Sequence, residues 1–215
     1  MKKYEIGSVK PENWEPSWPG EFEGFSHFEF AAGIPQVICA ITTRKANGLP
    51  NVCLHAWNAF SGPAGAFMCL LPGLCEYYHT VENLRREPAF CVNFLSRQHM
   101  AALHKTITEN APDVDELAVA GLHAEKAAKV AAPRIAEAFL TLECALESLG
   151  PCESESSLMA MGRVLHAAAA EGYMNGIDKR YGPEGFVFNI HAPRDAETGD
   201  RAPYGYGTLR VDETY

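Results

Sequence analysis

The chain has 215 residues, of which 47% are hydrophobic and 21% are charged. This composition is too apolar for a disordered chain and provides enough apolar side chains for a sizeable core. Acidic residues outnumber basic ones by 27 to 18, the formal net charge is -9, and no cluster of Lys and Arg occurs. No nucleic-acid partner is therefore expected, because proteins of that class neutralise rows of phosphates with basic side chains.

The sequence also predicts where the protein resides. No apolar run reaches the roughly 18 residues that a membrane-spanning helix needs, so no membrane association is expected. The segment Met1 to Gly24 has a basic start but lacks the apolar stretch of a signal peptide. The seven cysteines are odd in number, scattered, and mostly embedded in apolar stretches. This pattern is typical of buried free thiols in a reducing compartment, and it predicts a cytoplasmic protein.

Motifs of the common enzyme classes are absent. The sequence contains no G-x-G-x-x-G dinucleotide fingerprint, no G-x-x-x-x-G-K-[ST] phosphate loop and no G-x-S-x-G motif of the hydrolases. His99 and His104 have a spacing that occurs in zinc sites, but both lie in a polar segment typical of an exposed helix. We therefore expect no metal ion.

The first half of the chain predicts strands. Residues 37–43 are rich in β-branched side chains, and the Asn47-Gly48 pair predicts a tight turn into a second strand that begins near Asn51. Residues 66–71 and 89–94 are short apolar runs that predict two buried strands, the first of them closed by a Pro-Gly pair.

Three helical segments are predicted between and after these strands. Residues 80–86 fit a short helix with Thr80 as its N-cap, where the hydroxyl would accept a hydrogen bond from the amide three residues on. Residues 96–108 and 112–120 are also predicted to be helical, and Gly121 is placed to end the second of these.

From Leu140 apolar and polar residues alternate, which predicts a strand with one buried face. Residues 149–157 then form the expected loop and residues 158–166 the returning strand, in which Gly162 predicts a bulge or a point of close backbone approach. Several short strands with helices inserted among them predict a mainly β fold with helical insertions, a Greek-key barrel. We expect one domain over residues 1–215, with a core from about residue 25 to 170 and a C-terminal wrap over residues 171–215.

Ordered sequence segments resemble a known family. The segments are I-P-x-V-I-x-x-I-T-T, N-V-x-x-x-A-W-N-A-x-S, H-T-x-x-N-L, E-P-A-F-x-V-N-F and V-A-A-P-R-I-A-E-A-F-L-T-L-E-C, which begin at Ile34, Asn51, His79, Glu87 and Val130. Together they resemble the flavin reductase-like family of FMN-binding split β-barrels, which includes the flavoredoxins. The resemblance extends from about Ile34 to Leu165.

The resemblance implies a homodimer with one FMN per subunit and a function in flavin reduction or electron transfer. FMN would lie along the second strand, with its phosphate at hydroxyl groups and at the start of the following helix. These implied cofactor contacts involve Asn51, His55, Ala56, Trp57, Asn58, Ser61, His79, Thr80 and Asn83.

Three departures from the family pattern affect this site. Ala56 stands where many relatives have a small hydroxyl residue, and Leu54 stands where a proline is common. Residues 76–78, Glu-Tyr-Tyr, stand where a basic residue is common. The charge of the FMN phosphate would then be met by His79, Arg85 or Arg86, or by a residue of the partner subunit.

Each site residue also has a purely structural interpretation. Trp57 fits an ordinary barrel core, Thr80 fits a simple helix cap, and His79 fits a surface position.

Two functional classes stay open. The first is an FMN-dependent oxidoreductase that takes electrons from NADH or NADPH, or a carrier that exchanges electrons with a redox partner protein. The alternative is a non-catalytic split barrel that binds flavin or haem. No catalytic residue is assigned, because the protein's part in flavin chemistry is positioning and tuning.

Overall fold

The computed structural model of the chain describes residues 1, 3, 9, 10, 12, 33–154, 156–175, 179–190, 195, 198–200 and 205–212. The chain divides into two compact units, one of residues 37–187 with 208–215 and the other of residues 1–36 with 188–207. The expected single domain, with its core and C-terminal wrap, stays a prediction. Most of the segment Met1 to Gly24 and residues 201–204 of the expected C-terminal wrap fall outside the described residues.

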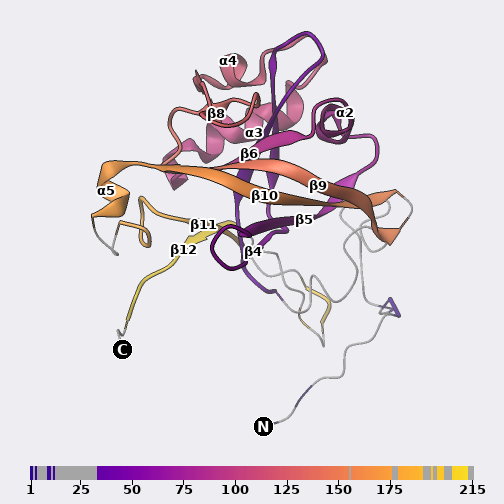
Figure 1. Ribbon diagram of the computed structural model, residues 1–215. Coiled ribbons are helices and arrows are strands. Elements are labelled where there is room, and N and C mark those ends of the chain that lie inside the picture. The colour runs from indigo at the N-terminus through magenta and orange to yellow at the C-terminus, as the bar shows by residue number, and fades with distance from the viewer. Residues whose placement is uncertain are drawn as a thin grey trace. The chain divides into compact units, whose positions relative to one another are not determined.

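The larger unit is built around a seven-stranded antiparallel sheet with the strand order β3-β2-β6-β9-β10-β5-β4. The long β9–β10 hairpin lies in the middle of this order and runs across the view in Figure 1. This mainly β architecture confirms the predicted fold class. The strands are β2 (Cys39–Arg44), β3 (Pro50–His55), β4 (Ala59–Ser61), β5 (Met68–Cys75), β6 (Ala89–Phe94), β9 (Leu140–Ser154) and β10 (Ser157–Ala169).

Short elements complete the described part of the chain. The helices are α2 (His79–Arg86), the 3-10 turn η1 (Arg97–His99), α3 (Met100–Thr108), α4 (Glu116–Ala120) and α5 (Glu171–Met174). The strands β1 (Gln36–Val37), β11 (Val187–Ile190) and β12 (Gly205–Thr208) form a three-stranded sheet, and β7 (Ala124–Glu125) pairs with β8 (Arg134–Ile135).

Successive side chains of a strand point to opposite faces, and both faces of β2 are buried. Cys39 and Ile41 belong to one apolar cluster, which α2 joins through Val81 and Leu84. Ala40 belongs to a second cluster, formed with β3, α3 and α4. The strands at this end of the sheet therefore lie between α2 on one face and the α3–α4 pair on the other.

The predicted β2–β3 hairpin is confirmed. Its turn is closed by a hydrogen bond of 2.9 Å from the Gly48 amide to the Lys45 carbonyl, and Gly48 has a φ of +87°. Such a φ is readily adopted by glycine because it has no Cβ. The register that follows pairs Thr43 with Asn51.

The prediction that Pro72-Gly73 ends a strand is wrong. β5 continues to Cys75 because a bulge accommodates the pair: Leu71 is opposite Ala160 and Leu74 is opposite Leu158, so two residues of β5 face one residue of β10. Gly73 has a φ of +76°, which suits the extra residue of such a bulge.

The loop predicted over residues 149–157 is largely strand. Pairing within the β9–β10 hairpin continues through Gly150 and Pro151, opposite Met159 and Leu158. The alternation of apolar and polar residues therefore predicted that the two strands exist but underestimated their length. Pairing with a neighbouring strand outweighs the turn propensities of Gly and Pro. Gly162 lies beside a register shift, which confirms the expected bulge; the group that approaches it is not backbone but the Phe90 side chain, whose Cζ would lie 2.4 Å from an added Cβ.

Two helix starts also differ from prediction. α2 begins one residue early, its N-cap is Tyr78 without a side-chain bond, and Thr80 is therefore not the cap. α4 begins at Glu116, because Asp115 accepts the Ala118 amide at 3.0 Å as N-cap. The end of α4 at Gly121 is confirmed.

Candidate functional site

A groove of about 410 Å³ runs along β3, between the start of α2 and the end of α3. It brings together three residues that the sequence analysis assigned to the cofactor, Asn51, His79 and Thr80. The remaining lining residues were not predicted. They are Val52, Cys53, Leu54, Tyr77, Tyr78, Thr106, Ile107, Asn110 and Glu116.

The wall formed by β3 is an edge of the seven-stranded sheet. The Val52 amide points away from β2 and donates to Oε2 of Glu116 at 2.6 Å. Because backbone groups alternate in direction along a strand, the peptide N–H and C=O of Leu54 point away from β2 as well. The edge thus presents backbone donors and acceptors, as the polar rim of a flat ring requires.

The opposite wall begins with the first turn of α2. The amides of Val81 and Glu82 both donate to the Tyr78 carbonyl, at 2.9 and 3.2 Å. Among the described residues, the amides of His79 and Thr80 donate no backbone hydrogen bond. A helix start with two unbonded amides and no side-chain cap is a site for an anion.

Thr80 is the residue through which β3 and α2 are joined at the groove. Its side chain is 2% exposed, and its Oγ1 accepts a hydrogen bond of 3.0 Å from Nδ2 of Asn51. A hydroxyl both accepts and donates, and the Thr80 hydroxyl also interacts with the side chain of Cys53 on β3, which lowers the pKa of that thiol against the larger effect of burial.

The lips of the groove are apolar and exposed. Tyr77 is 80% exposed and makes an edge contact with Tyr78, with ring centroids 5.2 Å apart. Ile107, on the α3 side, is 51% exposed. Together these side chains provide apolar surface against which a planar ring can pack.

Two further predicted residues, His55 and Trp57, do not line the groove. Burial lowers the pKa of His55 to about 4, and its Nε2 is buried with no described hydrogen-bond partner. The His55 and Trp57 rings make an edge contact with centroids 6.1 Å apart. A Cβ on Gly73 would lie 2.6 Å from the Trp57 ring, so the glycine in the β5 bulge leaves room for this ring.

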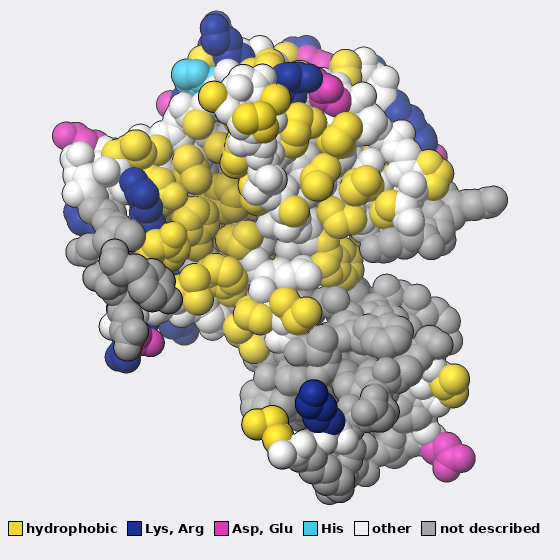
Figure 2. All heavy atoms as spheres, turned by 60° about the horizontal axis from the view of Figure 1, so that its bottom comes forward, with side chains coloured by type: hydrophobic (Ala, Val, Ile, Leu, Met, Phe, Trp, Pro, Cys, Tyr) yellow, Lys and Arg dark blue, Asp and Glu magenta, His cyan; other side chains and the backbone are white. Residues whose placement is uncertain are grey.

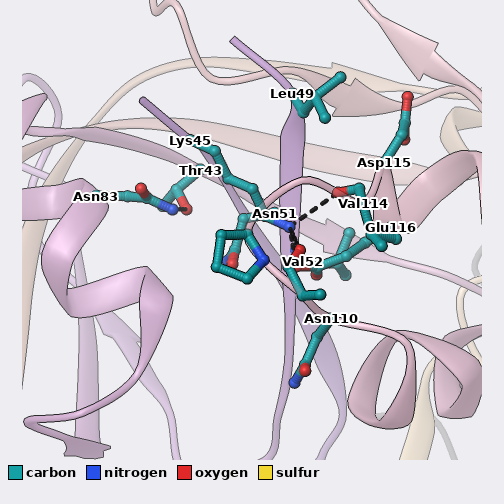
Figure 3. A network of polar contacts seen from close by, with 12 residues as sticks. Thr43, Lys45, Leu49, Asn51, Val52, Asn83, Asn110, Val114, Asp115 and Glu116 are labelled. Carbon is teal, nitrogen blue, oxygen red and sulfur yellow. Dashed lines mark hydrogen bonds and ion pairs between the residues drawn. The ribbon is translucent and has the colours of Figure 1, made fainter. Parts of the chain in front are cut away.

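The other predicted residues lie away from the groove. Asn58 donates through Nδ2 to the Val37 carbonyl at 2.8 Å, and Ser61 is exposed at the end of β4. Asn83 is buried and donates to Oγ1 of Thr43 at 3.0 Å, a contact drawn in Figure 3. Ala56 is half-buried against the apolar cluster of α3 and α4. Their roles toward a cofactor stay predictions.

Basic side chains near the groove are engaged elsewhere. Arg85 makes a two-pronged ion pair with Glu76, at 2.5 and 2.9 Å, and Arg86 donates to Oδ1 of Asn83 at 3.1 Å. The described lining contains no Lys or Arg, so His79 is the lining side chain that can carry positive charge.

A buried ion pair next to the groove was missed in the sequence. Nζ of Lys45 lies 2.8 Å from Oε1 of Glu116, and the two residues are 6% and 0% exposed, respectively. Burial raises the pKa of Glu116, and the Lys45 ammonium and the Val52 amide act against this rise. The sequence signal was available, since Asp115-Glu116 starts a helix, but nothing in it pointed to a lysine 71 positions earlier.

Other kinds of site are not found in the described part of the chain. No group of three or more His, Cys, Asp and Glu side chains there is arranged to hold a metal ion. None of the described helices is both long enough and apolar enough to cross a membrane. All seven cysteines are free thiols in the structure.

Comparison with known proteins decides the family. The flavin reductase like domain matches residues 31–183, well over half of the chain. The chain belongs to the flavin reductase-like family. This membership supports a flavin-related oxidoreductase as the general class of function. No curated protein sequence matches the chain.

Solved structures share the fold of this flavin reductase-like protein. Nitrilotriacetate monooxygenase component B from Bacillus cereus has a TM-score of 0.71 and 17% identity, covering 99% of this chain and 100% of that one. Flavoredoxin of Desulfovibrio vulgaris has a TM-score of 0.66 and 16% identity, covering 84% and 90%. The FMN-binding protein from Thermus thermophilus has a TM-score of 0.66 and 16% identity, covering 100% and 99%. These similarities establish the split-barrel fold.

Proposed function

We propose that this flavin reductase-like protein binds FMN in the β3 groove and acts in redox chemistry, as an NAD(P)H-dependent flavin or ferric reductase or as a flavoredoxin-type electron carrier. The observation that carries the proposal is the uncapped start of α2, where the amides of His79 and Thr80 lie beside the Thr80 hydroxyl. The family membership and the similarity to proteins described as a flavoredoxin and as FMN-binding support it.

The residues of the groove fit such a ligand by their chemistry. The start of α2 and the Thr80 hydroxyl would hold the phosphate, since amides and hydroxyls complement its charge. The outer edge of β3 at Leu54 would bond the polar rim of the ring, and Tyr77 and Tyr78 would shield it from water. When bound, FMN supplies the capacity to accept and pass on electrons, and hydrogen bonds from the protein tune its potential.

The first test is flavin binding itself, with Thr80→Val as the diagnostic change. We expect the wild type to quench the fluorescence of added FMN, and Thr80→Val to weaken binding by about 1 to 3 kcal/mol, the cost of one unmade bond to a buried polar group. Thr106→Val is the matched control, because the Thr106 hydroxyl also lies at the groove but donates to the Leu103 carbonyl at 2.7 Å. Equal affinities of the two variants would assign Thr80 a structural role only, and a wild type that binds no FMN would remove the proposal.

A second prediction separates the reductase from the carrier. We expect NADH or NADPH to bleach the visible flavin absorption of the FMN-loaded protein within seconds under anaerobic conditions, as hydride transfer to an accessible ring requires. Dithionite serves as the positive control. Reduction by dithionite or by a reduced ferredoxin, with no response to either nucleotide, would favour the electron carrier. A protein whose bound FMN cannot be turned over by any donor would favour the non-catalytic alternative.

A third prediction is a homodimer. Figure 2 shows hydrophobic side chains gathered over a broad area of one face. In the C-terminal half of β10 every second residue is apolar and exposed, namely Leu165, Ala167 and Ala169. The exposed Phe67 lies beside them, since its carbonyl accepts a hydrogen bond from the Val164 amide. Exposed apolar surface of this kind is typical of a subunit interface. We expect light scattering to give twice the chain mass at micromolar concentration and Leu165→Asp to give the monomer mass; a wild-type monomer would contradict the prediction.

A further inference from the structure

We propose that Glu116, held by Lys45, is a positioning residue that sets the preference of the β3 groove for oxidised over reduced flavin. The inference rests on the proposed function, because it concerns the same groove. It assigns to a buried carboxylate a role in tuning the ligand's redox state, in addition to its role in supporting β3.

The pair is fixed on all sides by the chain. Besides its contact with Glu116, Nζ of Lys45 donates to the carbonyls of Ala111 at 2.8 Å and Val114 at 2.9 Å. Figure 3 shows the Lys45 side chain running toward Val114 and Glu116. With the Val52 amide on its other oxygen, the carboxylate has little freedom to move or to exchange partners.

The two charges lie at different distances from the groove. Glu116 lines the groove, whereas Lys45 lines a separate hollow of about 150 Å³ together with Asn47 and Glu82. The negative end of the pair therefore lies on the groove side, just beneath its surface, since Glu116 itself is 0% exposed. No Lys or Arg among the described lining residues offsets it there, and His79 is the one lining group that both hollows share.

This orientation has a defined effect on a flavin. Two-electron reduction with uptake of one proton leaves the ring with one negative charge more than before, whereas uptake of two protons leaves it neutral. A fixed carboxylate disfavours the anionic product, and its effect is large where water is excluded. The groove should thus bind oxidised flavin in preference to the anionic reduced form.

The test is the ratio of affinities for reduced and oxidised FMN, obtained from the midpoint potentials of bound and free flavin in an anaerobic dithionite titration. Glu116→Gln keeps an oxygen for the Val52 amide but removes the charge and leaves the Lys45 ammonium. We expect the ratio to rise about tenfold, which corresponds to about 30 mV for a two-electron couple. A purely structural role would weaken both redox forms equally and leave the ratio unchanged.

Two further variants make the result decisive. The double variant Lys45→Met with Glu116→Gln removes both charges, so its ratio should lie between those of the wild type and Glu116→Gln, and it tests the proposal even where the single variant does not fold. Glu82→Gln removes an exposed carboxylate near the groove and should change the ratio less than twofold. The inference is overturned if the double variant has the same affinity ratio as the wild type. It is also overturned if the ratio does not rise in the order wild type, double variant, Glu116→Gln. A wild type that binds no FMN overturns the proposed function and this inference together.

Discussion

Glu143→Ala should destabilise the protein by about 3 to 5 kcal/mol, the usual cost of removing one partner from a buried ion pair. The Glu143 side chain is fully buried in β9. Its carboxylate accepts the amides of Ala128 at 3.0 Å and Lys129 at 2.6 Å, and Nε of Arg134 at 2.8 Å. Alanine would leave two amides and a partly buried guanidinium without their acceptor. Urea unfolding measures the loss as a lower midpoint at unchanged m-value.

The control is Glu147→Ala on the same strand. Glu147 pairs with Arg163 at 2.5 Å, but both side chains are over one-third exposed, so solvent screens the pair and the loss should be far smaller than for Glu143→Ala. Equal losses in the two variants would contradict the assignment of Glu143 as the anchor of the loop before β8.

Acidification provides an independent check on Glu143. Burial by itself would raise the pKa of this carboxyl, but the Ala128 amide, the Arg134 guanidinium and the Lys129 amide together lower it. A carboxyl whose folded-state pKa is depressed stabilises the fold above its unfolded-state pKa, and that contribution is lost as the pH falls through the folded-state value. The stability difference between wild type and Glu143→Ala should therefore shrink as the solution is acidified.

Gly73→Ala is the second change with a large expected effect. An L-residue at a φ of +76° costs about 1 to 2 kcal/mol, and forcing a methyl group against the Trp57 ring adds about 1 to 3 kcal/mol of overpacking. Gly121→Ala is the matched control, because Gly121 has a φ of +73° and no atom lies within 4 Å of the added Cβ. Thermal or urea unfolding should show a larger loss of stability for Gly73→Ala than for Gly121→Ala. Equal losses of stability would show that the Trp57 ring moves aside without an energetic penalty.

The same variant distinguishes the two interpretations of Trp57. Since Trp57 follows the strand that lines the groove, displacing its ring should also weaken FMN binding if the tryptophan contacts the cofactor. FMN affinity that stays at the wild-type value in folded Gly73→Ala would make Trp57 a core residue only. Gly121→Ala again provides the comparison, because Gly121 does not line the groove and no atom lies within 4 Å of its added Cβ.

The sequence predicted strands reliably where side-chain pattern decides them. The β2–β3 turn and the bounds of β6 follow from β-branched runs and the Asn-Gly pair. The ends of β5 and of the β9–β10 hairpin were wrong because Pro and Gly were taken as terminators. In the structure Pro72 and Gly73 form a bulge within β5. The bulge depends on pairing with β10, which is distant in sequence.

The groove was predictable only in part, for the same reason. Asn51, His79 and Thr80 belong to segments that resemble the family, and the structure places them together. The wall formed by α3 and α4 comes from a later part of the chain whose side chains carry no local signal. The ion pair between Lys45 and Glu116 depends on a contact that neither helix propensity nor strand alternation encodes.

The position of the β9–β10 hairpin has a consequence for how the chain reaches its fold. β6 and β5 are separated by only 13 residues in sequence, yet they flank the hairpin on opposite sides and each pairs with one of its strands. Until residues 140–169 have left the ribosome, β6 and β5 both present unpaired edges, which invite association with other chains. Completing the sheet requires pairings across long stretches of sequence, and such pairings form slowly. The last third of the chain therefore controls when the nascent protein ceases to be vulnerable to aggregation.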